Sequence, residues 1–250
     1  MKNTATAIAV FFVAGAANSA PVDLSTWLAE GPGNWSLAGD NNSVFQSLNG
    51  NPTVFHNNTA SSQNKALSGT ITVETTADDD YIGFVLGYNA GDLLNAAADY
   101  LLIDWKQANQ GSFGCNADVG LSISHVSGAL GNNAGAWCHD PAGNVTELAR
   151  ASTLGSTGWL DNTTYSFDLI FTGSLVEVKV NGVTEISLAG SFADGGFGFY
   201  NYSQQGVRYA GIGEEVVVDP PSPVPLPAAL PMLGAALGLL AAAAARRRRA

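Results

Sequence analysis

The chain has 250 residues, and its 21 acidic residues against ten basic ones give a net charge of −11. Between residues 20 and 219 the imbalance is larger, because all 21 acidic residues but only five Lys or Arg lie there, a net charge near −16. Such a surface repels nucleic acid and anionic lipid, which excludes nucleic-acid binding. Cation binding and solubility outside the cell both suit it.

The first 19 residues have the three-part layout of a secretory signal peptide. Lys2 makes the start basic, an apolar stretch runs from Ala5 to Ala17, and small residues at Ala17 and Ser19 suit a signal peptidase. The apolar stretch is too short to span a bilayer comfortably. We therefore expect residues 1–19 to be removed and the protein to be exported.

Short runs with strand character follow one another through residues 20–218, and no long amphipathic helix interrupts them. The alternating runs Leu175–Val180 and Val183–Leu188 flank Asn181-Gly182, the strongest two-residue hairpin signal. One helical turn or a short helix is expected only at Asp92–Ala98. Together these runs predict one all-β domain, an antiparallel β-sandwich. Further strands are expected at Thr70–Thr75, Tyr81–Tyr88, Tyr100–Lys106, Gly120–His125, Thr164–Phe171 and Gly196–Tyr202.

A second three-part segment ends the chain, after a proline-rich spacer at residues 219–223. An apolar run to Ala245 is about long enough to cross a bilayer, and the four arginines after it would stay cytoplasmic. With its opening motif this segment resembles the VPLPA form of the PEP-CTERM sorting signals, which exosortase-type membrane enzymes recognise and cleave. The resemblance implies that residues 224–250 are a sorting signal that anchors the protein in the membrane only before processing; a permanent C-terminal membrane helix is the alternative. The motif residues are Val224, Pro225, Leu226, Pro227 and Ala228.

Several segments of the body carry a second resemblance. Ala77–Tyr88 places three aspartates before an apolar strand, Tyr100–Gln107 ends in Trp-Lys-Gln, and Gly196–Tyr200 is a late aromatic strand. In this order they resemble the C-terminal domain of thrombospondins, a jelly roll of the concanavalin A-like (L-type lectin) kind, over about residues 33–213. The chain departs from that pattern in Asn95–Ala98, which is inserted before the second strand.

The adjacent aspartates Asp78, Asp79 and Asp80 are the candidate metal ligands. Calcium takes six to eight oxygen ligands, and a loop of aspartates that leads into a buried strand supplies such ligands at a rigid edge. The thrombospondin-like resemblance also implies calcium. Asn51 and Asp161 are weaker candidates to complete the shell. The alternative is an acidic loop that points into water, where screening keeps the repulsion small.

The cysteines Cys115 and Cys138 are expected to form a disulfide, as an isolated pair in an exported protein usually does. The loop between them gives a stabilisation of roughly 3 kcal/mol in the chain-entropy model. Zinc is the alternative, because His139 adjoins Cys138 and His125 lies between the two cysteines, although no Cys-x-x-Cys spacing is present.

The aromatic residues Trp105 and Tyr88 are candidates for a ligand-binding platform that stacks on sugar rings, although such residues in a sandwich more often fill the core. No nucleophile elbow, zinc-protease motif or phosphate loop is present, so we expect no enzymatic activity. The leading hypothesis is an exported cell-surface or matrix protein whose lectin-like domain binds calcium and extracellular polysaccharide. The alternatives are a structural matrix protein without a specific ligand and a polysaccharide-active glycosidase.

Overall fold

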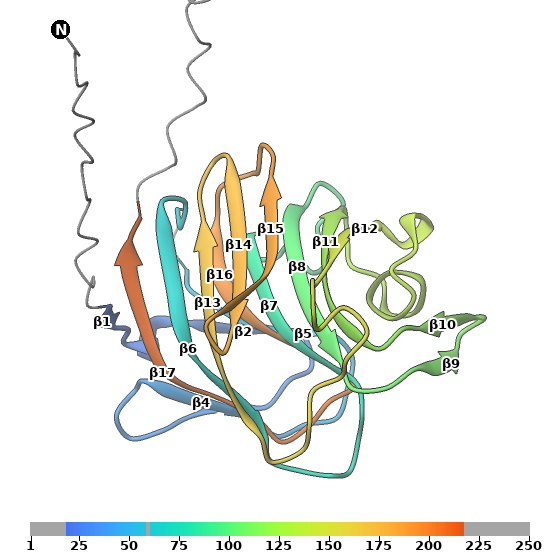
Figure 1. Cartoon of the computed structure of the whole chain (residues 1–250), viewed down its shortest axis with the longest axis horizontal. Coiled ribbons are helices and arrows are strands. Elements are labelled where there is room, and N and C mark those ends of the chain that lie inside the picture. Colours follow the sequence, from blue (N-terminus) through green and yellow to red (C-terminus); the bar gives the residue numbers. More distant parts are fainter. Residues whose placement is uncertain (1–18, 59–60, 218–250) are drawn as a thin grey trace, which may run out of the picture. The chain divides into compact units, whose positions relative to one another are not determined.

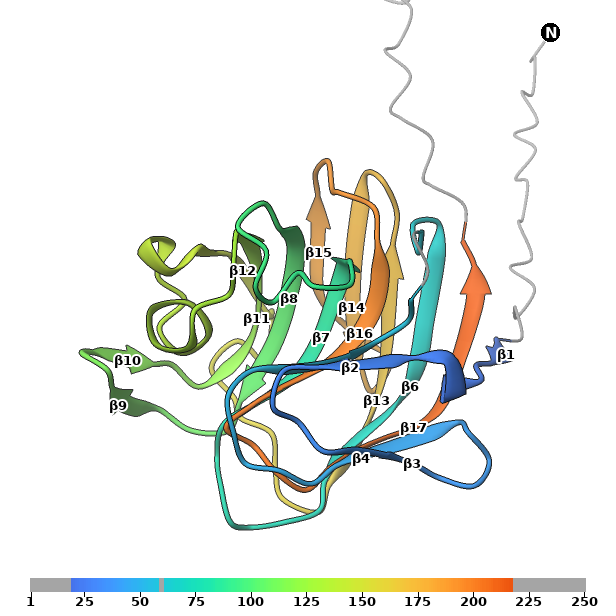
Figure 2. The same cartoon turned by 180° about the vertical axis from the view of Figure 1, so that it is seen from behind.

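Two antiparallel sheets packed face to face form the body of the protein (Figure 1; Figure 2). A computed structural model describes residues 19–58 and 61–217. It confirms the all-β sandwich. The expected signal peptide (1–19, all but its last residue) and sorting signal (224–250) lie outside the described residues and stay predictions. Within the described part of the chain, no helix has the length and apolar character needed to cross a membrane.

The strands of each sheet follow one another in space in an order that differs from their order in the chain. Sheet A consists of β15 (Val183–Ala189), β14 (Leu175–Val180), β13 (Thr164–Phe171), β6 (Lys65–Val73), β17 (Val207–Val216), β4 (Ser43–Gln46) and β3 (Trp35–Leu37), with β1 (Ala20–Pro21) paired to β17. Sheet B consists of β12 (Val145–Arg150), β11 (Gly120–Ser127), β8 (Asp99–Lys106), β7 (Tyr81–Tyr88), β16 (Gly196–Tyr202), β5 (Thr53–His56) and β2 (Leu28–Glu30). A separate hairpin joins β9 (Gln110–Ser112) to β10 (Cys115–Ala117), and the short helices are η1 (Leu24–Thr26), η2 (Asn132–Trp137) and η3 (Pro141–Gly143).

No short helix forms at Asp92–Ala98, so that form of the prediction is wrong; the segment forms consecutive turns. The carboxylate of Asp92 accepts hydrogen bonds from the backbone of Asn89 (2.8 Å) and from the side chain of Asn95 (3.0 Å). Side-chain bonds of this kind satisfy polar groups locally and compete with the helical ladder.

The hairpin predicted at Asn181-Gly182 is confirmed, and both residues have the positive φ that its turn requires, 50° and 78°. The register of β14 with β15 shifts between Val178 and Lys179. Glu185, opposite this irregularity, is buried, and its carboxylate accepts hydrogen bonds from the backbone of Thr153 (2.9 Å) and other groups of the same turn. Glu185 therefore anchors that turn instead of facing solvent.

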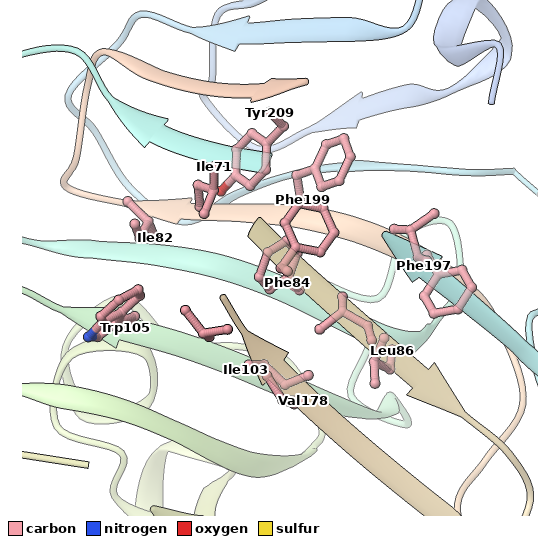
Figure 3. Packing of buried hydrophobic residues seen from close by; sticks show 14 of the residues in the cluster. Ile71, Ile82, Phe84, Leu86, Ile103, Trp105, Val178, Phe197, Phe199 and Tyr209 are labelled. Atoms are coloured by element: carbon pink, nitrogen blue, oxygen red, sulfur yellow. The ribbon is translucent and has the colours of Figure 1, made fainter. Parts of the chain in front are cut away.

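The main core lies between the two sheets, where alternate residues of their strands meet. Figure 3 shows Phe84 of β7, Phe199 of β16 and Tyr209 of β17 close together within it. The rings of Phe199 and Tyr209 stack with centroids 4.3 Å apart. The Tyr209 hydroxyl lies within hydrogen-bond distance of backbone and side-chain oxygens of sheet B, and its one proton links the two sheets through a polar contact inside the core.

Sheet B is buried on its other face as well. Every residue of β7 is buried, and Tyr81, Val85 and Tyr88 belong to a second apolar cluster that excludes the inter-sheet residues. Residues 110–117 and 130–143, which we call the cover, contribute side chains to this cluster. Burial on both faces explains why the β7 sequence is continuously apolar and not alternating.

Candidate metal centre

The three adjacent aspartates lie in the loop between β6 and β7, directly before β7 begins at Tyr81. Asp78, Asp79 and Asp80 each offer a carboxylate oxygen, and these atoms all lie within 4.8 Å of one another. Asp78 and Asp79 are half-buried, whereas Asp80 is only 3% exposed. The fold therefore brings the three predicted carboxylates together at one edge of the sandwich.

One ammonium group is already part of this cluster. Lys106, at the end of β8, is fully buried, and its Nζ donates to Asp80 Oδ1 (2.6 Å), to the backbone oxygen of Asp79 (3.2 Å) and to Gln110 Oε1 (3.0 Å). The Asp79 carboxylate lies 3.6 Å from the same nitrogen. All three ammonium protons thus have acceptors, and Asp80 is committed to a buried ion pair.

Aromatic rings complete the surroundings of this ammonium. Lys106 Nζ lies 4.6 Å from the ring of Trp137 in η2 and 5.3 Å from the ring of Tyr81. The Tyr81 hydroxyl donates to the backbone oxygen of Trp137 (3.0 Å). Cation–π attraction of this kind is strongest for a desolvated cation, so Lys106 joins the aspartate loop to the cover.

The charges in the loop do not balance. Within the described chain the only basic side chain paired with these three carboxylates is Lys106, which leaves a net charge of about −2. Burial, together with repulsion from Asp80 and Asp79, raises the pKa of Asp78 to about 6. The loop is therefore electrostatically short of positive charge near Asp78.

Sequence reasoning nominated Asn51 and Asp161 as further ligands, and the structure places them differently. The amide that bonds the Asp78 carboxylate belongs to Asn49, whereas Asn51 lines a separate cleft. Asp161 accepts a hydrogen bond from the side chain of Gln107 (3.3 Å), whose backbone N–H donates to the Asp79 carbonyl (3.2 Å). Asp161 is thus connected to the loop indirectly.

Sequence reasoning assigned no role to Lys106 or Asn49. The signal for Lys106 was a basic residue at the end of a strand that is buried from Tyr100 onward, but its partner depends on the register that pairs it with Tyr81. Asn49 lies 29 residues before Asp78 in the chain, and no local pattern connects them.

The proposed sugar-stacking residues do not offer their rings to solvent. Tyr88 is fully buried and Trp105 is 3% exposed. The Tyr88 hydroxyl donates to Glu30 Oε2 (2.6 Å), and Trp105 Nε1 donates to the backbone oxygen of Thr157 (2.7 Å). Their burial argues against the stacking platform, because each ring packs inside one of the two apolar clusters.

The predicted disulfide between Cys115 and Cys138 is confirmed, with a Cα–Cα distance of 5.9 Å. It rules out the zinc alternative, since zinc binds thiolates. The two histidines of that alternative pair with carboxylates instead: His139 Nε2 donates to Asp104 Oδ2 (2.8 Å), and His125 lies 2.9 Å from Asp99. The bridge ties β10 to η2 and so holds the two parts of the cover together.

The fold defines the class, a lectin-like two-sheet β-sandwich of the concanavalin A-like and galectin-like kind. Residues 31–215 match the family described as Thrombospondin C-terminal region, and the chain belongs to this family. It is 25% identical over 198 residues to Thrombospondin-3b of Danio rerio and 24% identical over 201 residues to cartilage oligomeric matrix protein of Rattus norvegicus. Each alignment covers 72% of this chain but only 20% and 25% of those proteins.

Solved structures show the same fold. The carbohydrate-binding module CBM66 of Bacillus subtilis is similar with a TM-score of 0.52 at 11% identity, over 76% of this chain and 95% of the module. The exoplasmic/lumenal domain of VIP36, in its Ca2+/Man3GlcNAc-bound form, is similar with a TM-score of 0.50 at 14% identity, over 80% of this chain and 87% of that domain.

Proposed function

We propose that this domain is a non-catalytic, calcium-binding module at the cell surface or in the extracellular matrix. The observation that carries the proposal is the uncompensated charge of the aspartate loop, where three carboxylates face one buried lysine. One divalent cation would neutralise the remaining charge of about −2. Calcium is the hard cation that such flexible oxygen-rich loops bind outside cells.

The residues present fit a calcium ion next to the lysine. Asp78 and Asp79 are half-buried and keep carboxylate oxygens free of Lys106 hydrogen bonds. Asn49 contributes its amide oxygen if the amide group is turned, since Ser203 Oγ, which now bonds Asn49 Oδ1, can equally accept from the amide nitrogen. Asp80 then acts at the edge of the shell, because Lys106 holds it. When bound, calcium would supply positive charge that fixes the loop.

Carbohydrate is proposed as a further ligand of the domain. Support comes from two proteins of similar structure, one a carbohydrate-binding module and the other a domain bound to calcium and a mannose-containing glycan. Extracellular polysaccharide is the partner that this likeness suggests, with an adhesive role in the matrix.

Export and processing complete the proposal. The disulfide suits an oxidising compartment, and residues 1–19 would direct export. The VPLPA-type segment at residues 224–250 would anchor the protein in the inner membrane until an exosortase-type enzyme cleaves it. Mass spectrometry of the protein from the cell envelope tests this step. Loss of the terminal arginines is expected, and their retention would favour a permanent C-terminal membrane helix.

Calcium titration followed by thermal unfolding and calorimetry tests the metal proposal. At calcium concentrations about 100-fold above Kd the folded state should gain about 2.7 kcal/mol. Asp78→Asn with Asp79→Asn should abolish the gain, whereas Asp118→Asn, a change at an exposed aspartate outside the cluster, should leave it intact. No heat of binding and no change in Tm would favour the structural matrix protein. Hydrolysis of envelope polysaccharides would favour the glycosidase.

A further inference from the structure

A cleft of about 480 Å³ lies among the loops that follow β2, β7 and β11 and precede β5. Leu93, Leu94 and Leu130 form much of its wall, and the amide side chains of Asn51 and Asn132 lie among its lining residues. This volume is within the range of small-molecule sites, which combine apolar walls with a few fixed polar groups.

Glu30 supplies the fixed polar group of this cleft. Its carboxylate accepts hydrogen bonds from the Tyr88 hydroxyl (2.6 Å) and the Gly91 backbone N–H (2.7 Å), and His56 Nε2 lies 3.3 Å from it. A carboxylate offers about four acceptor positions, so at least one is left for a further donor. Its side chain is 21% exposed and lines the cleft, which makes that position accessible.

The mouth of the cleft exposes a large apolar side chain for which the fold gives no reason. Leu94 is 88% exposed, while its neighbour Leu93 is 7% exposed and packs in the second apolar cluster. The loop that carries both is held by Asp92, through its bonds to Asn89 and Asn95. A rigid loop thus keeps Leu94 in water beside an apolar wall. The segment Asn95–Ala98 continues this loop.

We propose that the cleft binds a small molecule with a branched aliphatic body and a hydrogen-bond-donating head. The body would pack against the leucines, and the head would donate to the acceptor position left on Glu30. None of the residues that line the cleft is aromatic, which disfavours a sugar ring, since sugars are commonly held by aromatic stacking. The cleft shares no residue with the aspartate loop, so this proposal does not depend on the calcium proposal.

Three probes with one carbon skeleton test the proposal: 3-methylbutylamine, 3-methylbutanol and 3-methylbutanoate. Saturation-transfer NMR on the full chain should detect the amine and the alcohol at millimolar concentration. The carboxylate should fail, because it has no donor at neutral pH and Glu30 repels it. A stronger signal from the amine than from the alcohol would show that the charge of Glu30 is used as well as its acceptor position.

Variants locate the binding. Leu94→Asn should weaken amine and alcohol binding about tenfold, because the wall loses an apolar side chain, without affecting the fold of an 88% exposed position. Leu160→Asn makes the same change at a 61% exposed leucine outside the cleft and should leave binding unchanged. Equal binding of all three probes, no binding of any, or equal effects of the two variants would overturn the proposal.

Discussion

Lys106 provides the sharpest test of how the aspartate loop is built. We expect Lys106→Met to be severely destabilising. The change keeps an unbranched apolar chain of similar length but removes the ammonium that bonds Asp80, the Asp79 carbonyl and Gln110. Asp80, at 3% exposure, would be left as a buried carboxylate without a cation.

The magnitude follows from this burial. Removing one partner of a buried ion pair costs about 3–5 kcal/mol, because the other charge stays desolvated. For a domain of this size Tm should fall by about 10 °C. Lys65→Met is the matched control, since Lys65 and Glu214 are 2.9 Å apart but about a third exposed, and such surface pairs contribute less than about 1 kcal/mol.

Urea unfolding at neutral pH without calcium gives the free energy of unfolding for both variants. Adding Asp80→Leu to Lys106→Met should restore a large part of the loss, because both charges are then gone. Lys106→Met should also bind calcium more tightly than the unsubstituted protein, since it frees Asp80. If Lys106→Met costs no more than Lys65→Met, the ammonium is solvated in solution and the reasoning fails.

Three further predictions concern other parts of the chain. Replacing Cys115 and Cys138 by Ser should lower the free energy of unfolding in urea by roughly 3 kcal/mol; an unchanged value would mean that the cover is held without the bridge. The pKa of Asp78, raised to about 6 from its ordinary 3.8, favours folding at low pH, and this contribution is lost as pH rises through about 6. Asp78→Asn should flatten that part of the calcium-free stability profile, and an identical profile would contradict the assignment. Glu185→Ala should cost about 2 kcal/mol in the same urea assay by freeing the turn it anchors, and a loss below about 0.5 kcal/mol would refute that role.

Strands could be predicted from the sequence wherever local pattern and tertiary burial agree. Tyr81–Tyr88, Thr164–Phe171, Leu175–Val180 and Gly196–Tyr202 have the predicted bounds. The turns at Asp92–Ala98 were not predicted, because the apolar and alanine content of this segment favours a helix. Its conformation depends instead on hydrogen bonds of the Asp92 side chain. Burial of Glu185 depends on a register shift between β14 and β15, which no period-2 pattern reveals.

The candidate site was predictable only in its acidic half. Three consecutive aspartates are visible in the sequence, but the cation that faces them comes from β8, and its position depends on the pairing of Tyr81 with Lys106. For Tyr88 and Trp105 the sequence suggested a ligand role from residue type alone. Only the packing of both faces of sheet B shows that the two rings are buried.

The position of β17 has a mechanical consequence. This ten-residue strand is the last one among the described residues and lies inside sheet A, paired with β6 on one side and with β4 on the other. A pulling force applied at its C-terminal end acts along the strand, so the hydrogen bonds to both neighbours resist in shear and must break together. A protein tethered through this end would therefore withstand tension that would peel an edge strand away one bond at a time.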